Sequence, residues 1–584
     1  MPQGRRKIPF SGKAKKEQLK AKKQGKHPQS QDHRGTNRKK VLLMDRSDDE
    51  ENGSEAVQKV NYQPTRGKQG NRYILQFYKE ADEEIKRRKE LARHSLEYIS
   101  EDKLEINGDE YFPKDLDFPK RPLWSYDMSR EEVEMREQRY FMEYLNHLEK
   151  KFSWKDLSYF ELNLETWRQL WRVLEMSDII LFIIDIRFPA LMFPPSLYDY
   201  TTNVLKKDMI LVMNKIDLSP APLVAAWKNY FKEKYPNLHI LMFTSLPGYN
   251  LIGNQSNKSG LQVRRRKGKL KMASEGAQLL LDICKDIVKE QVDLASWQNK
   301  IKEEMSMEYD ENEAVQIEES ISIKKIDTGF YQHNKYIDGV LTIGCIGQPN
   351  VGKSSVMNAL MGKKVVSVSR TPGHTKHFQT IFLTRNVRLC DCPGLVFPSK
   401  VPKVCQVLMG SFPIAQLREP YTTIKYLAER IDLPKLLKID HPDGDDSWSA
   451  MDICDGWAKK RGLITAKAAR LDSYRAANSI LRMALDGKLC LSLTPPHYTE
   501  RKDFWLNHSD VEIVKWIQAK GGSDMENIEN IPPEDLSDDD DGDELHSAAC
   551  GGPDESSEST CEEEISDTED VVASTNKFAA LSDA

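Results

Sequence analysis

The sequence lacks any apolar run long enough to cross a bilayer, and its cysteines show no paired spacing. Its longest apolar stretch, 179–184, ends at Asp185 and is far shorter than the roughly 18 residues of a membrane span. The basic N-terminus has no apolar signal core. None of the nine cysteines forms a C-x-x-C pair, and Cys390-x-Cys392 is too tight for structural zinc. We therefore predict a soluble intracellular protein with reduced thiols, no zinc site and no membrane partner.

In contrast, the chain is long and rich in charged residues. The chain has 584 residues, of which 39% are hydrophobic and 30% charged, which is enough for a sizeable core and more than one folded unit. Residues 1–40 carry 14 Lys and Arg against 2 Asp and Glu, whereas residues 534–584 carry 18 Asp and Glu against one Lys. Neither end has the apolar content to fold alone. We predict a basic disordered tail at 1–45 and an acidic disordered tail at 521–584.

Between the tails, periodicity predicts a helical tract and then alternating strands and helices. The tract covers about 130–176, and four of its residues share one face that we expect to pack in the core: Trp167, Leu170, Trp171 and Leu174. Strand patterns follow at 179–184, 209–213 and 238–243, with a helix at 222–234, and this alternation predicts a parallel α/β sheet. The expected divisions are an N-terminal extension at 46–130, a helical segment at 131–176, an α/β domain at 177–400 with an insertion or linker at about 250–335, and a mainly helical domain at 401–520.

The most informative motif follows a predicted strand at 341–346 and opens a predicted helix that includes Ser355. It reads Gly347-Gln348-Pro349-Asn350-Val351-Gly352-Lys353-Ser354, which is GxxxxGK[ST] in the context that a phosphate-binding loop requires. Glycines let main-chain N–H groups turn toward phosphate oxygens at a helix N-terminus, where the dipole favours anions. We expect Lys353 to reach the β- and γ-phosphates and the Ser354 hydroxyl to bind Mg2+.

A second motif, Asn214-Lys215-Ile216-Asp217, follows the predicted strand at 209–213. A carboxylate at Asp217 can accept both the ring N–H and the amino group of guanine, and adenine leaves that charge unpaired, which is strongly penalised. The dipeptide Thr244-Ser245 fits a short loop that backs the base, with an ordinary turn as the alternative.

The third motif, Asp391-Cys392-Pro393-Gly394, follows a predicted strand at 387–390. In a phosphate site Asp391 would hold the Mg2+ shell and the Gly394 N–H would sense the γ-phosphate. Upstream, the turn 370–375 offers a hydroxyl to complete that shell, and we select Thr375 over Thr371.

Together these three motifs are the set found in GTPases, but in a permuted order, because the base-reading motif precedes the phosphate loop. The order, together with DIRFP at 185–189, SVSRTPGHTKHFQT and CDCPGL, resembles the circularly permuted GTPases of the MMR/HSR type; large-subunit export GTPases share TPGHTKHFQT. The resemblance implies a circularly permuted Ras-like P-loop domain with N- and C-terminal helical extensions and charged tails. It also implies GTP/GDP binding with Mg2+, slow hydrolysis, and proteins that are nuclear or nucleolar or that assemble ribosomes.

Two residues bear on turnover. Leu395 follows Gly394 where Ras-like enzymes place a water-orienting glutamine, so we expect impaired hydrolysis by the usual route. Asn350 resembles the asparagine that ligates K+ in cation-activated GTPases, where it would bring a positive charge to the transition state; the alternative is that it braces the loop. The candidate catalytic residues are Lys353, Thr375, Gly394 and Asn350.

Three hypotheses follow for function. The first is a slow GTP hydrolase that switches an RNA or ribonucleoprotein partner such as a ribosomal particle. The second is a module whose bound nucleotide is structural, and the third is an RNA-binding protein whose basic tail carries the main activity. The tail predicts nuclear targeting or RNA contact, with a merely solvated tail as the alternative. We expect the nucleus, with the nucleolus and cytoplasm as further candidate compartments, and nothing in the sequence points to DNA.

Overall fold

The computed structural model describes residues 59–60, 75–125, 127–244, 262–264, 269–306, 334–362, 366, 379–465, 470–519 and 525–527. The predicted basic tail lies outside these ranges, as do nearly all of the acidic tail and the site candidates Ser245, Thr371 and Thr375. Among the residues that the structure describes, no helix has the length and hydropathy of a transmembrane span.

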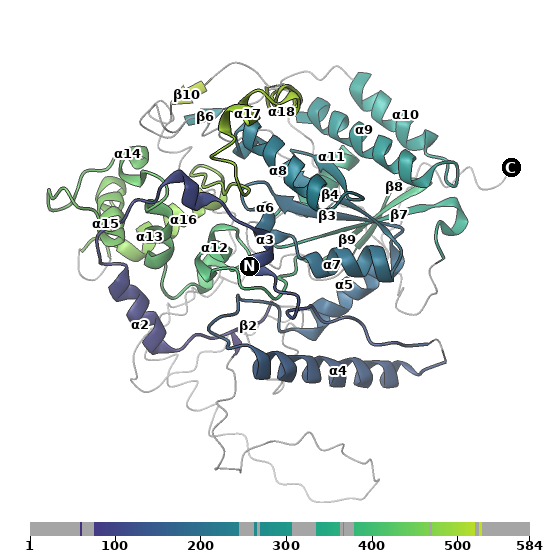
Figure 1. Ribbon diagram of the computed structural model, residues 1–584, viewed down its shortest axis with the longest axis horizontal. Coiled ribbons are helices and arrows are strands. Elements are labelled where there is room, and N and C mark those ends of the chain that lie inside the picture. The colour runs from purple at the N-terminus through teal and green to yellow at the C-terminus, as the bar shows by residue number, and fades with distance from the viewer. Residues whose placement is uncertain are drawn as a thin grey trace, which may run out of the picture. The chain divides into compact units, whose positions relative to one another are not determined.

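A six-stranded sheet forms the centre of the α/β domain (Figure 1). Its strands lie in the order β5 (His239–Met242), β4 (Asp208–Asn214), β3 (Ile179–Asp185), β7 (Leu341–Gly347), β9 (Val387–Asp391) and β8 (Gln379–Thr384). Every pair is parallel except β8 with β9. The central strands are buried along almost their whole length, as expected for a parallel sheet covered on both faces. The predicted parallel α/β sheet is therefore confirmed, with one antiparallel edge strand that we did not predict.

The helices that pack on this sheet include α5 (Leu164–Met176), α9 (Lys269–Val288) and α11 (Lys353–Met361). Asn163 caps α5 by accepting a hydrogen bond from the Glu165 N–H. The predicted apolar face of α5 is buried, and both tryptophan ring N–H groups have backbone partners: Trp167 donates to Glu161 and Trp171 to Pro119. The expectation that these tryptophans pack in the core is confirmed.

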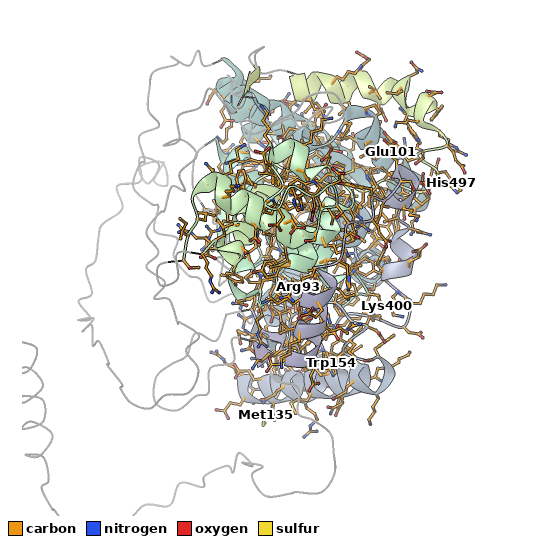
Figure 2. The ribbon with its side chains drawn as sticks, turned by 90° about the vertical axis from the view of Figure 1, so that its left-hand side faces the viewer. Arg93, Glu101, Met135, Trp154, Lys400 and His497 are labelled. Atoms are coloured by element: carbon orange, nitrogen blue, oxygen red, sulfur yellow. The ribbon has the colours of Figure 1, made fainter. Side chains whose placement is uncertain are left out.

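The prediction of a single helical tract at 130–176 is wrong. These residues divide into α4 (Arg130–Lys151) and α5, separated by an extended segment. In that segment Ser158 and Glu161 donate backbone hydrogen bonds to Ser399 and Val396, so tertiary pairing takes the place of helical bonds. Helix α4 turns its buried residues inward, while Met135 on its outer side is 64% exposed (Figure 2).

The predicted insertion at 250–335 is, in its described part, a component of the domain core. Helices α9 and α10 (Ala295–Ser306) pack on each other, and α9 also contacts α11 and β5 while α10 contacts β8. Leu280, Leu281 and Trp297 are fully buried in this layer. The helical spacing of those apolar residues is the signal that the composition-based interpretation overlooked.

The C-terminal part begins with a helical cluster: α12 (Lys403–Leu408), α13 (Tyr421–Ala428), α14 (Leu433–Leu437), α15 (Ala450–Arg461) and α16 (Ser473–Leu485). From the N-terminal extension, α2 (Asp82–Leu91) packs on α13. The chain then returns to the α/β domain, where α17 (Lys502–Leu506) and α18 (Ser509–Ala519) lie against α8 (Ala221–Lys234) (Figure 1). The shorter α-helices and strands of the described residues are β1 (Lys59–Val60), β2 (Phe77–Tyr78), α3 (Gly108–Tyr111), α6 (Pro189–Met192), α7 (Pro195–Asp199), β6 (Gln262–Arg264) and β10 (Met525–Asn527).

Candidate nucleotide site

The three sequence motifs meet at one edge of the sheet. Strands β4, β3, β7 and β9 are parallel neighbours in that order. The carboxyl ends of β4, β7 and β9 are Asn214, Gly347 and Asp391. Loops that leave this edge of an open α/β sheet form its usual ligand-binding crevice. Residues that are far apart in sequence are thus neighbours here.

The phosphate-loop motif forms the turn between β7 and α11. Asn350 and Gly352 adopt left-handed backbone conformations, with φ of 59° and 95°, which Asn tolerates and Gly takes without steric cost. A Cβ on Gly347 would lie 2.4 Å from the carbonyl oxygen of Ile183, so only glycine fits there. Helix α11 begins directly after this turn, at Lys353, and a helix N-terminus that follows a glycine-rich turn is a favourable place for an anion.

Lys353 lies inside this turn. It is only 7% exposed, and its Nζ donates to the Gln348 carbonyl at 2.8 Å. Burial lowers the pKa of Lys353, and the neighbouring carboxylate of Asp391 opposes that effect. A buried ammonium group whose described partner is a carbonyl can exchange that carbonyl for a phosphate oxygen.

The Asn214–Asp217 motif is bound directly to the phosphate loop. The Asn214 side-chain amide donates to the Val351 carbonyl at 2.8 Å, and Lys215 Nζ donates to the Asn350 carbonyl at 2.7 Å. Asp217 lies in a short 3-10 turn, η3 (Ile216–Leu218), and accepts a hydrogen bond from the Thr244 hydroxyl at 2.7 Å. One ligand can therefore contact both loops at once.

Asp391 has the surroundings of a metal ligand. Its carboxyl group is fully buried; Oδ2 accepts from the Ser354 hydroxyl at 3.3 Å, and no hydrogen-bond partner among the described residues reaches Oδ1. Burial raises the pKa of Asp391 to about 6, although Lys353 and Ser354 oppose that rise. A buried carboxylate oxygen without a partner is costly, and a hard cation such as Mg2+, which prefers oxygen ligands, would satisfy it. These two side chains fit Mg2+.

The loop after Asp391 lies directly under the phosphate loop. A Cβ on Gly394 would lie 2.8 Å from Pro349 Cα and 3.1 Å from Lys353 Nζ. Leu395 is fully buried, and its N–H donates to the Gly347 carbonyl at 3.3 Å. Its apolar side chain offers no group that could orient a water molecule.

Sequence reasoning missed two parts of this site. The first is a buried ion pair, in which Arg187 donates to both carboxylate oxygens of Asp185. Lys215 Nζ also donates to Asp185 Oδ2, at 2.9 Å. In addition, Arg187 Nη1 donates to the Ala484 carbonyl in α16 at 2.7 Å. The DIRFP segment contains both Asp185 and Arg187, but its resemblance to a known pattern did not indicate that they pair. Nothing in the sequence indicated the distant contact with Ala484.

The second missed part is a segment after β9 that touches the phosphate loop. The Asn350 side-chain amide donates to the Gly410 carbonyl at 3.0 Å, and the Ser411 hydroxyl contacts Gln348 Oε1 at 2.6 Å. Two residues of the phosphate loop are thus held by the chain that leads into the C-terminal helices.

The fold and its motifs define a P-loop GTPase whose domain is circularly permuted, as the sequence motifs predicted. A family model described as a 50S ribosome-binding GTPase matches residues 342–426. Guanine nucleotide-binding protein-like 1 from Homo sapiens is 45% identical over 547 residues, which cover 88% of this chain and 90% of that protein. The chain therefore belongs to the guanine nucleotide-binding protein-like 1 family of GTPases.

Two further comparisons are more distant. Large subunit GTPase 1 from Saccharomyces cerevisiae is 33% identical over 402 residues, which cover 66% of this chain and 58% of that protein. The crystal structure of GNP-bound YlqF from T. maritima aligns with a TM-score of 0.32 and 16% identity, over 56% of this chain and 97% of that one.

Proposed function

We propose that this protein binds guanine nucleotides with Mg2+, hydrolyses GTP slowly to GDP and phosphate, and uses that change as a switch on a ribosomal or other ribonucleoprotein particle. The observation that carries the proposal is the direct bonding of the Asn214–Asp217 turn to the phosphate loop. A base held by Asp217 and phosphates held by Lys353 can belong to one molecule only if these loops keep a fixed separation.

The proposed roles follow the motifs. Asp217 accepts the guanine N–H groups, with Asn214, Lys215, Ile216, Thr244 and Ser245 shaping the base pocket, and residues 347–355 surround the phosphates. Ser354, Thr375 and Asp391 hold Mg2+, which when bound neutralises developing charge on the phosphates. Gly394 would donate its N–H to the γ-phosphate, and Cys392, Pro393 and Leu395 set the course of that loop.

Substituting Asp391 by asparagine is expected to separate stability from metal binding. In the nucleotide-free protein the change removes a buried charge with an unsatisfied oxygen, so the melting temperature at pH 7.5 should rise or stay the same. The affinity for GTP in the presence of Mg2+ should fall by about tenfold or more, since a charged ligand to the cation is lost. Calorimetry with and without Mg2+ tests this; a variant that keeps the wild-type Mg2+ effect contradicts the role given to Asp391.

Slow hydrolysis is proposed because Leu395 is buried and carries no group that could orient water. The same feature favours the second candidate function, a module whose bound nucleotide is structural and is scarcely turned over. Single-turnover phosphate release, measured with and without ribosomal particles, separates the two. Release that stays at the uncatalysed rate under all conditions would leave only the structural module.

K+ is proposed to accelerate hydrolysis relative to Na+. The Asn350 amide nitrogen donates to Gly410, which supports the bracing alternative, whereas a K+ ion would bind its Oδ1. Rates in the two chlorides should be compared at matched ionic strength, with Asn350→Ala as the variant that removes the ligand. Equal wild-type rates in both salts would reject the cation and leave Asn350 as a brace.

A ribosomal partner is proposed from the names of two similar proteins: the matching family is described as a 50S ribosome-binding GTPase, and the yeast relative is called Large subunit GTPase 1. The dense basic charge of residues 1–40 supports contact with RNA. Purifying the GTP-bound protein from cells and identifying the RNA and proteins bound to it tests the partner class.

Nuclear accumulation, including the nucleolus, is expected to depend on the basic N-terminal segment. Deleting residues 1–40 should move a fluorescent fusion toward the cytoplasm. A fusion that localises as before would transfer the role to the second basic run, 264–271, or to neither segment, which deleting that run would decide.

A further inference from the structure

Helix α18, which precedes the acidic C-terminal segment in the sequence, contacts the turn at residues 216–219. This turn carries Asp217 and is called the base-recognition turn below. Gln518 in this helix is 7% exposed, and its amide nitrogen donates to the Ile216 carbonyl at 2.7 Å and to the Ser219 carbonyl at 2.8 Å. These two carbonyls lie on either side of Asp217 in the sequence. Residues about 300 positions apart are thus joined by two hydrogen bonds.

The turn is short and makes few hydrogen bonds of its own. It is a three-residue 3-10 helix that follows Lys215 in a left-handed conformation. The Leu218 N–H donates to the Lys215 carbonyl at 2.9 Å, whereas the Ser219 N–H reaches Ile216 O only at 3.4 Å. Short 3-10 turns have poor hydrogen-bond geometry. On one side the Thr244 hydroxyl holds the Asp217 carboxylate itself, and on the other Gln518 holds the backbone that carries it.

Helix α18 is itself anchored to the α/β domain independently of this contact. Asp510 forms an ion pair with Lys228 of α8 at 2.9 Å, and Val511 and Val514 are buried. The position of Gln518 is therefore fixed by packing that does not involve the turn.

We propose that Gln518 is a positioning residue for guanine recognition: it holds the Ile216–Ser219 backbone so that the Asp217 carboxylate faces the base. This inference rests on the proposed function, in which Asp217 reads guanine. It makes base selectivity depend on a C-terminal helix outside the motif-bearing loops.

The test uses the full-length chain and the variant Gln518→Met, which keeps the side-chain length and removes the donors. Affinities for fluorescent GDP and fluorescent IDP are compared, because the base of IDP lacks the 2-amino group from which Asp217 would accept a hydrogen bond. We expect GDP to bind about tenfold more weakly and the preference for GDP over IDP to shrink several-fold, as loss of two hydrogen bonds predicts. The control Asp510→Asn, which loosens the same helix without touching the turn, should keep the wild-type preference.

An unchanged GDP to IDP preference in Gln518→Met would overturn the positioning role, even if both nucleotides bind more weakly, since that pattern indicates general loosening. Where Gln518→Met fails to fold, Gln518→Asn replaces it, because its shorter amide cannot reach both carbonyls. Failure of the proposed function is recognised separately: Asp217→Asn would then leave GDP binding unchanged.

Discussion

The variant Asp217→Asn is expected to lose most of its affinity for GTP and to gain affinity for xanthosine triphosphate. A buried carboxylate accepts two hydrogen bonds from guanine, whereas an amide presents a donor in place of one acceptor, which suits the extra carbonyl of xanthine. Sites built around such hydrogen bonds reject a mismatched partner strongly, because groups without partners are left buried. We expect GTP affinity to fall by about 100-fold or more.

Calorimetry with GTP, xanthosine triphosphate and ATP measures this exchange. The matched control is Thr244→Val, which removes the hydroxyl that bonds to Asp217 and keeps the carboxylate. It should weaken GTP by about tenfold at most, the worth of one hydrogen bond, without favouring xanthine. Unchanged GTP affinity in Asp217→Asn would remove this residue from the base site.

Replacing Arg187 by methionine is expected to lower the free energy of unfolding by about 3–5 kcal/mol. Asp185 is fully buried and receives hydrogen bonds from both Arg187 and Lys215. Burial alone would raise the pKa of Asp185, but the two cations outweigh it and hold the pKa well below its usual range. In Arg187→Met the buried carboxylate keeps Lys215 as its remaining cation and the backbone N–H at position 187 as a further donor. The Ala484 carbonyl loses the guanidinium and keeps the Gly487 N–H.

Urea unfolding at pH 7 tests this prediction. Because the folded pKa of Asp185 is depressed, its stabilisation is present at neutral pH and is lost only as the pH falls below the unfolded value near 3.8. Lys234→Met is the matched control, because its ion pair with Asp109 is partly exposed and should contribute less than about 1 kcal/mol. The double variant Asp185→Asn, Arg187→Met should recover part of the loss. A cost below that of Lys234→Met would show that this buried ion pair does not stabilise the fold.

Contiguous motifs could be predicted from the sequence because each is confined to one turn. Strand, glycine turn and helix at 341–361 follow from local spacing, and so does the turn that carries Asp217. Strand β8 was missed because it lies at the sheet edge and only alternate residues are buried, which gives a weaker pattern than the continuous apolar run of β3.

Long-range partners could not be predicted, since a single sequence holds no record of them. Gln518 is one polar residue in an amphipathic helix, and only the return of α18 to α8 brings it to the base-recognition turn. Gly410 acts through its backbone carbonyl, which every residue type possesses. The break between α4 and α5 likewise depends on pairing with the distant segment 396–399.

We expect the nucleotide state to be transmitted from the phosphate loop to the C-terminal helices. Loss of the γ-phosphate would release the loop at Gly394, which runs through Phe397 into that region, and Gly410 and Ala484 already bond to residues of the nucleotide site. A ligand can bias such a region only by contacting its two states differently.

Hydrogen exchange of the full-length protein, bound to GDP or to a non-hydrolysable GTP analogue, measures this transmission. We predict that protection differs between the two states in Tyr474–Leu485 of α16, as well as in the nucleotide loops. If the differences stop at Phe397, the nucleotide state does not reach the C-terminal helices, which are then a structural brace for the permuted domain.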